Sequence, residues 1–117
     1  MANTKIGEYV VTCHDSTWTY LCAGEGPPVI WLHGLWGEPG WELHHQRLAE
    51  QYTVYAPALP GYHGSAFPSW MIDVEDAATL LIDFLDILKL ERPIFIGHSL
   101  GGVLVQGVVI PYDLRGR

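Results

Sequence analysis

Apolar side chains along this chain fall into short β-branched runs that alternate with longer stretches of helical spacing. Two such runs, from Glu8 to Cys13 and from Thr17 to Cys22, flank a polar turn and predict an antiparallel hairpin. Three further runs predict strands over 28–32, 52–57 and 93–96. The first of these three is apolar throughout, which is typical of a parallel strand covered on both faces.

A helix is expected between the first two of these three strands, over about residues 41–51. Its inward stripe is expected to be Leu43, Arg47 and Leu48. The adjacent His44 and His45 would point about 100° apart on a helix, whereas a two-histidine metal face needs a spacing of four residues. Both histidines are therefore interpreted as surface side chains.

A second helix is expected to begin near Asp73, whose carboxylate can cap the first free backbone amides. Apolar residues then recur at helical spacing as far as Leu88. A third helix follows the last strand from Leu100 and is expected to end at Pro111. This alternation predicts an α/β fold in a single domain over residues 1–117: a mostly parallel sheet with an N-terminal antiparallel hairpin and flanking helices.

Composition excludes several classes of partner. The 117 residues carry a net charge of −7 and no run of lysine or arginine, which disfavours nucleic acid and anionic membrane surfaces. No apolar stretch approaches the ~20 residues of a membrane helix, and the first residues lack the apolar core of a secretory signal, so a cytoplasmic protein is expected. Cys13 and Cys22 form no disulfide framework and are interpreted as free thiols. No residue pattern calls for a metal or a cofactor.

The most specific motif is Gly97-His98-Ser99-Leu100-Gly101, between the last predicted strand and the last predicted helix. A G-x-S-x-G sequence at such a junction forces its serine into a strained conformation above the sheet. A side chain at either flanking glycine would collide with the neighbouring strand or helix. The serine hydroxyl is then exposed at the positive end of the helix dipole, as a nucleophile requires.

A strand–turn–helix junction with this sequence is called a nucleophile elbow, and residues 97–101 are named the elbow below. Two other motifs precede it along the chain: Trp31-Leu32-His33-Gly34-Leu35-Trp36-Gly37, and Ala56-Pro57-Ala58-Leu59-Pro60-Gly61-Tyr62-His63-Gly64-Ser65. Together the three motifs span nearly the whole chain and resemble the N-terminal portion of the α/β-hydrolase superfamily, of the serine esterase, thioesterase and C–C hydrolase type. The second motif departs from the family's pattern, because Ala58 stands where an aspartate is frequent and His63 is inserted. The resemblance implies a partial α/β-hydrolase fold without its late strands, which acts on a small-molecule acyl substrate and uses no cofactor.

The resemblance also implies roles for individual residues. Ser99 corresponds to the catalytic nucleophile, and the backbone N–H groups of Leu100 and Leu35 correspond to the oxyanion-hole donors. His33 and Gly34 would support the oxyanion loop, Gly34 by letting the backbone come close and His33 by bracing it. A serine at the elbow makes epoxide hydrolase or haloalkane dehalogenase chemistry less expected, because those relatives use an aspartate nucleophile there.

Other residues near the elbow have structural or open interpretations. Gly97, His98 and Gly101 form the elbow itself, and His98 is not expected to act as the base because adjacent side chains diverge on so sharp a turn. Three aromatic residues lie on loops at the C-terminal ends of strands, where ligands bind in open α/β sheets. These residues, which either line an apolar pocket or pack within their own loops, are Trp36, Phe67 and Trp70.

In the family an acid and then a histidine follow the elbow serine. Eighteen residues follow Ser99 here, with Asp113 as their one acid and no histidine among them. The sequence is therefore interpreted as the front portion of an enzyme, close to inactive by itself. The alternatives are a non-catalytic remnant that serves as a binding module, and a second polypeptide that completes the sheet. Without late strands, Ile94-Phe95-Ile96 becomes an apolar sheet edge, which predicts self-association.

Overall fold

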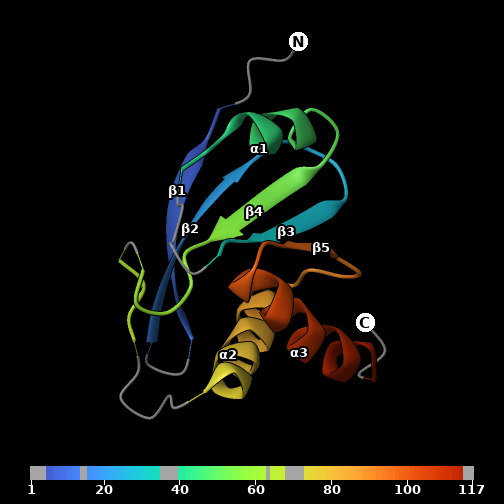
Figure 1. The fold of residues 1–117 in the computed structure, drawn as a ribbon. Helices are drawn as coiled ribbons and strands as arrows, with labels where there is room; N and C mark the ends of the chain where they lie inside the picture. The colour runs from blue at the N-terminus through green and yellow to red at the C-terminus, as the bar shows by residue number, and fades with distance from the viewer. Residues whose placement is uncertain (1–4, 14–15, 35–39, 63, 68–72, 115–117) are drawn as a thin grey trace.

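Five strands form one sheet with helices on both faces in the computed structural model, which describes residues 5–13, 16–34, 40–62, 64–67 and 73–114 (Figure 1). The strands are β1 (Gly7–Cys13), β2 (Ser16–Ala23), β3 (Pro28–Leu32), β4 (Thr53–Pro57) and β5 (Ile94–Gly97). The helices are α1 (Leu43–Leu48), α2 (Val74–Ile87) and α3 (Leu100–Leu114). Every predicted strand and helix is present, so the α/β fold class is confirmed.

The sheet has the order β1-β2-β4-β3-β5. β2 pairs antiparallel with both β1 and β4, whereas β3 pairs parallel with both β4 and β5. The predicted edge position of β5 is confirmed, and Ile94 on this edge is 45% exposed. Because β3 and β5 are parallel neighbours with Leu32 opposite Gly97, the loops that follow these two strands begin side by side.

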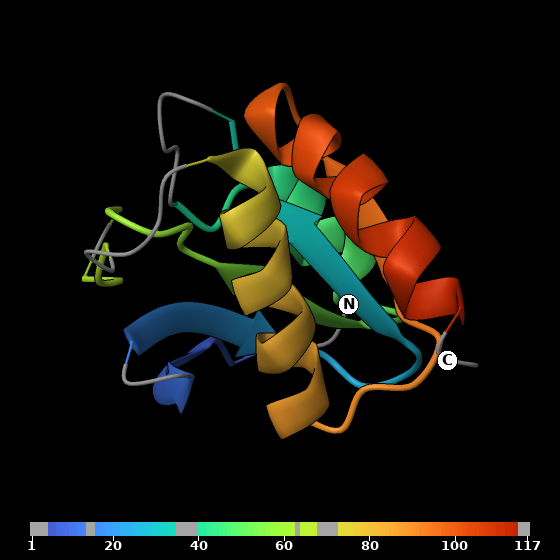
Figure 2. The same cartoon turned by 90° about the horizontal axis from the view of Figure 1, so that it is seen from below.

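The larger part of the core lies between the sheet and the helices α2 and α3, which run next to each other across one face (Figure 2). Trp18 of β2 is fully buried there and stacks on Phe84 of α2, with ring centroids 5.3 Å apart. The predicted start of α2 is confirmed, because the Asp73 carboxylate accepts a hydrogen bond of 3.0 Å from the Asp76 N–H. None of the helices that the structure describes has the length and apolarity needed to cross a bilayer.

On the other face of the sheet, α1 differs from its prediction. It is only six residues long, and Leu43, expected to point inward, is 68% exposed. The buried side of α1 instead presents His45, which is 3% exposed, and leads to buried Ala49 four residues later. The interpretation of His45 as a surface residue was therefore wrong, because the helix turns this imidazole, and not Leu43, toward the sheet.

The expected end of α3 was also wrong. The helix continues through Pro111 to Leu114. A proline removes one backbone hydrogen bond and crowds the preceding turn, but the residues after it can keep helical dihedrals. Pro111 therefore lies within the last turns of α3 instead of ending it.

Candidate active site

The strand β5 passes into α3 through a two-residue turn at His98 and Ser99. Ser99 has a φ angle of +57°, in the left-handed region that costs a non-glycine residue about 1–2 kcal/mol. The turn is held by backbone hydrogen bonds, from the His98 N–H to the Leu32 carbonyl at 3.0 Å and from the Gly102 N–H to the Ser99 carbonyl at 2.8 Å. The predicted elbow geometry is present, and Ser99 is exposed at the start of α3.

Both glycines of the elbow occupy positions that leave no room for a side chain. A Cβ atom on Gly97 would lie 2.5 Å from the carbonyl carbon of Gly101 in the first turn of α3. A Cβ atom on Gly101 would overlap the backbone carbonyl of Leu32 at the end of β3. These close approaches join β3, β5 and α3 at one point, and they confirm the predicted collisions with helix and strand.

The first backbone N–H of α3 belongs to Leu100, one of the two predicted oxyanion donors. The first N–H groups of a helix have no partner within the helix. In the part of the chain that the structure describes, no backbone acceptor pairs with the Leu100 N–H, whereas the Gly101 N–H donates to the His98 carbonyl at 3.0 Å. The Leu100 N–H is thus available at the positive end of a fifteen-residue helix, directly after Ser99.

The loop after β3 approaches the elbow closely. A Cβ atom on Gly34 would lie only 2.8 Å from Nδ1 of His98, so this approach requires a glycine. His33 is 4% exposed, and its Nε2 accepts a hydrogen bond of 2.9 Å from the Leu59 N–H. Its Nδ1 therefore carries the proton and donates to the Gly34 carbonyl at 2.8 Å. Because both nitrogens are engaged, His33 braces the loop and has no lone pair to offer as a base.

Of the remaining predicted site residues, the structure describes only Phe67. Leu35, Trp36, Trp70 and the inserted His63 lie outside the described residues. Phe67 is 62% exposed and lies over Gly61, at 3.2 Å from where a Cβ on that glycine would be.

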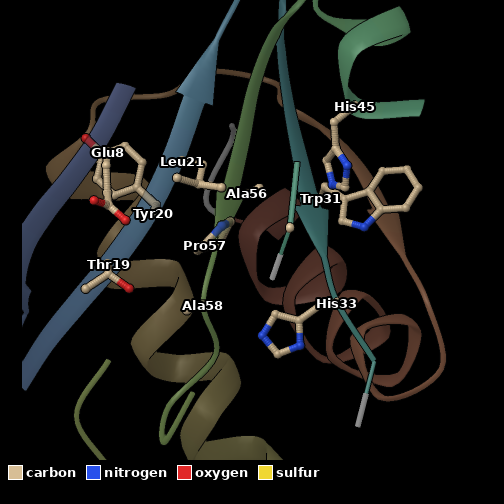
Figure 3. Close-up of a pocket in the computed structure, with 11 residues that line it drawn as sticks. Glu8, Thr19, Tyr20, Leu21, Trp31, His33, His45, Ala56, Pro57 and Ala58 are labelled. Atoms are coloured by element: carbon tan, nitrogen blue, oxygen red, sulfur yellow. The ribbon is translucent and has the colours of Figure 1, made fainter. Parts of the chain in front are cut away.

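A cavity of about 150 Å³ lies on the α1 face of the sheet. It is bounded by Glu8 and Thr19 on one side, by Trp31 and His45 on the other, and by His33 at one end (Figure 3). Neither Phe67 nor Ser99 lines it. This cavity was not predicted from the sequence, because its walls come from four separate strands, β1 to β4, and from His45, which was expected at the surface.

The histidine pair on α1 has a structural role. Nδ1 of His45 accepts a hydrogen bond of 3.1 Å from the Glu42 N–H, which caps the start of the helix. Ligand atoms of Glu42, His44 and His45 come within 4.8 Å of one another. However, a neutral imidazole that accepts at Nδ1 carries its proton on Nε2, so His45 has no free lone pair for a cation. Glu42 and His45 therefore form the cap at the start of α1.

Burial changes the protonation of His45. Desolvation, with a smaller contribution from the neighbouring His44, lowers the pKa of His45 from 6.5 to about 4. Its ring stacks on Trp41 at a centroid distance of 5.2 Å and contacts Trp31 at 4.8 Å. The side chain is therefore neutral at physiological pH and packs as an aromatic group.

Comparisons with known proteins agree on one family. A model described as the alpha/beta hydrolase family matches residues 29–116. An uncharacterized protein of Mycobacterium tuberculosis is 36% identical over 92 residues, which cover 78% of this chain and 27% of that protein. The 1-acylglycerol-3-phosphate O-acyltransferase ABHD5 of Rattus norvegicus is 29% identical over 109 residues, with coverage of 86% and 31%.

Solved structures have the same fold. The epoxide hydrolase CorEH superimposes with a TM-score of 0.81 at 30% identity, covering 95% of this chain and 39% of that one. The chain thus spans about a quarter to two-fifths of the length of the proteins it matches.

Proposed function

The chain belongs to the alpha/beta hydrolase family, and from this premise we propose that it carries the nucleophile of a serine hydrolase that cleaves a carboxylic ester or a thioester. The observation that supports this most is the conformation of Ser99. A non-glycine residue at φ +57°, exposed before a long helix and flanked by two glycines that admit no Cβ, is strained by its surroundings. Strain of this kind persists where a site requires it.

The proposed chemistry is acyl transfer through a covalent intermediate. The hydroxyl oxygen of Ser99 attacks the carbonyl carbon of the substrate while its proton passes to a base. The resulting oxyanion accepts hydrogen bonds from the Leu100 N–H and, by the family resemblance, from the Leu35 N–H. Collapse expels the alcohol or thiol, which takes up the proton, and water then hydrolyses the acyl-serine ester.

The base of this reaction is proposed to lie outside this sequence. Among the described histidines, His33 has both ring nitrogens engaged, and His45 is buried in the cap of α1. His44 is on α1 and stacks on Trp31, remote from the elbow. His98 adjoins the serine, but its ring is turned toward Gly34. We therefore propose that the acid and the histidine of the triad come from residues that this sequence does not contain.

The alternative is a non-catalytic binding module. The observation in its favour is that His33 and His45 are engaged in other hydrogen bonds, and that the His98 ring is turned toward Gly34. Epoxide hydrolysis is a weaker candidate despite the resemblance to CorEH, because the relatives with that chemistry use an aspartate at the elbow and this chain has Ser99.

A fluorophosphonate probe distinguishes the two functions. We expect slow modification of the folded chain that maps to Ser99 by peptide mass spectrometry and is lost in Ser99→Ala. Without a base, the oxyanion donors alone are expected to leave a rate roughly 10³–10⁴-fold above that of water. Equal labelling of Ser99 in folded and urea-unfolded chain would favour the binding module. Ester turnover at ~1–10³ s⁻¹ would show that the chain contains its own base.

A further inference from the structure

A buried serine that the proposed reaction does not use helps to hold the loop after β4. Backbone hydrogen bonds to β2 also hold this loop, from the Ala58 N–H to the Thr19 carbonyl at 2.9 Å and from the Ala66 N–H to the Thr17 carbonyl at 2.8 Å. Ser65 is 6% exposed, and its Oγ donates a hydrogen bond of 2.6 Å to the Ala58 carbonyl. The same oxygen accepts a hydrogen bond of 3.0 Å from the Thr19 N–H in β2. The Ser65 hydroxyl thus ties both ends of the loop to each other and to the neighbouring strand.

This loop contains the residue that holds His33. Leu59 directly follows Ala58, is buried, and donates its N–H to Nε2 of His33 at 2.9 Å. Tyr62 of the same loop packs edge-on against the His33 ring, with centroids 4.8 Å apart. The position of the loop therefore sets both the orientation of His33 and which of its nitrogens carries the proton.

The His33 tautomer in turn acts on the proposed oxyanion loop. With Nε2 accepting from Leu59, Nδ1 must carry the proton, and it donates to the Gly34 carbonyl at 2.8 Å. A hydrogen bond to this carbonyl restrains the peptide group that follows Gly34, because a peptide group is planar. By the family resemblance, the N–H of that peptide group is the proposed second oxyanion donor.

We propose that Ser65 is a positioning residue for the oxyanion hole, which it controls through Ala58–Leu59, the His33 tautomer and the Gly34 peptide group. Ser65 is buried, and its proposed role does not involve contact with substrate. It holds the loop from which His33 receives its hydrogen bond. This inference rests on the proposed function for its catalytic consequence, but its structural part can be tested without any activity.

The test is the protonation state of the His33 ring, measured by ¹⁵N NMR of the folded chain. We expect a single Nδ1–H tautomer in the wild type, with a ring N–H that exchanges slowly with water. In Ser65→Ala we expect a mixture of tautomers and faster exchange, because Leu59 is no longer held in line with Nε2. The labelling rate of Ser99 should fall by about tenfold, since loss of an oxyanion donor outright costs roughly 10²–10³-fold.

Ser16→Ala is the matched control. Ser16 is another buried serine, 3% exposed, and its hydroxyl has no hydrogen-bond partner among the described residues. Removing it deletes the same atom type from β2 without touching the loop after β4, so the His33 tautomer and the labelling rate should match those of the wild type. An equal change in both variants would show a general effect of losing a buried hydroxyl and would overturn the proposal.

The outcomes separate this proposal from the proposed function. An Nε2–H tautomer in the wild type, or an unchanged tautomer in Ser65→Ala, would overturn the positioning role. A tautomer shift in Ser65→Ala, with no labelling of Ser99 in any protein, would support the positioning role and reject the proposed function. If circular dichroism shows that Ser65→Ala is unfolded, Ser65→Cys takes its place, because a thiol keeps the side-chain bulk but is only a weak donor. It should shift the tautomer in the same direction, and an unchanged tautomer would again overturn the proposal.

Discussion

The buried His45 makes the stability of the chain depend on pH in a way that can be calculated. In the unfolded chain an ordinary histidine binds a proton below pH ~6.5, whereas burial lowers the pKa of His45 in the folded chain to about 4. The folded state therefore favours the neutral form. This contribution to stability is fully present above pH ~6.5 and is lost as the pH falls toward 4, because the unfolded chain binds the proton first.

The magnitude follows from the two pKa values. At ~1.36 kcal/mol for each pKa unit, the full effect is about 3 kcal/mol. About 2 kcal/mol of it should be lost between pH 7 and pH 5, before most carboxylates titrate. For a small domain whose total stability is roughly 5–15 kcal/mol, this loss is large enough to measure.

Urea unfolding followed by circular dichroism at pH 7, 6 and 5 measures the effect. The variant His45→Gln cannot titrate, yet its amide oxygen can still accept from the Glu42 N–H in a capping box. We expect its free energy of unfolding to change by about 2 kcal/mol less over this range than that of the wild type. His44→Gln, on the exposed neighbour, should keep most of the wild-type pH dependence. Parallel pH profiles for His45→Gln and the wild type would refute the reasoning.

Two further predictions concern the elbow and the sheet edge. Gly101→Ala should destabilise the chain by about 1–3 kcal/mol in the same urea assay, because its Cβ would collide with the backbone carbonyl of Leu32. Gly102→Ala, whose Cβ would lie 3.5 Å from its nearest neighbour, should be neutral or slightly stabilising. An equal loss of stability in both variants would contradict the close approach at Gly101. Analytical ultracentrifugation should show that the chain associates through β5 as its concentration rises. Ile94→Lys should weaken this association, whereas Ile87→Lys on α2, at the same 45% exposure, should leave it unchanged. A wild-type chain that stays monomeric at all concentrations would reject the edge as a contact.

The features that the sequence predicted correctly depend on local rules. The five strands follow from β-branched runs bounded by turn residues, and the elbow follows from the steric demands of a strand–turn–helix junction, which leave Gly97 and Gly101 no substitute. The cap of α2 was predictable for the same reason, since Asp73 accepts from an amide only three residues away, that of Asp76.

The features that it did not predict depend on contacts between distant segments. Hydrophobic periodicity assigned Leu43 to the inner side of α1. The sequence around α1 does not indicate that Trp31 and Trp41 would pack against the His45 ring and bury it. His33 accepts its hydrogen bond from the backbone N–H of Leu59, which lies on another loop. Because every residue except proline has such an N–H, the side chain at position 59 gives no sign of this contact. The role of Ser65 was hidden for a related reason, since its partners are the backbone groups of β2 and of its own loop.

The parallel pairing of β3 with β5 has a consequence for how the chain folds. These strands meet at the elbow, but α1, β4 and α2 lie between them in the sequence, so pairing β3 with β5 closes a long loop of chain. Contacts between such distant partners form slowly compared with a hairpin such as β1–β2. Labelling of Ser99 should therefore report the last stage of refolding. Ser99 should stay unreactive while only the β1–β2 hairpin has formed, and it should react once the whole sheet has assembled.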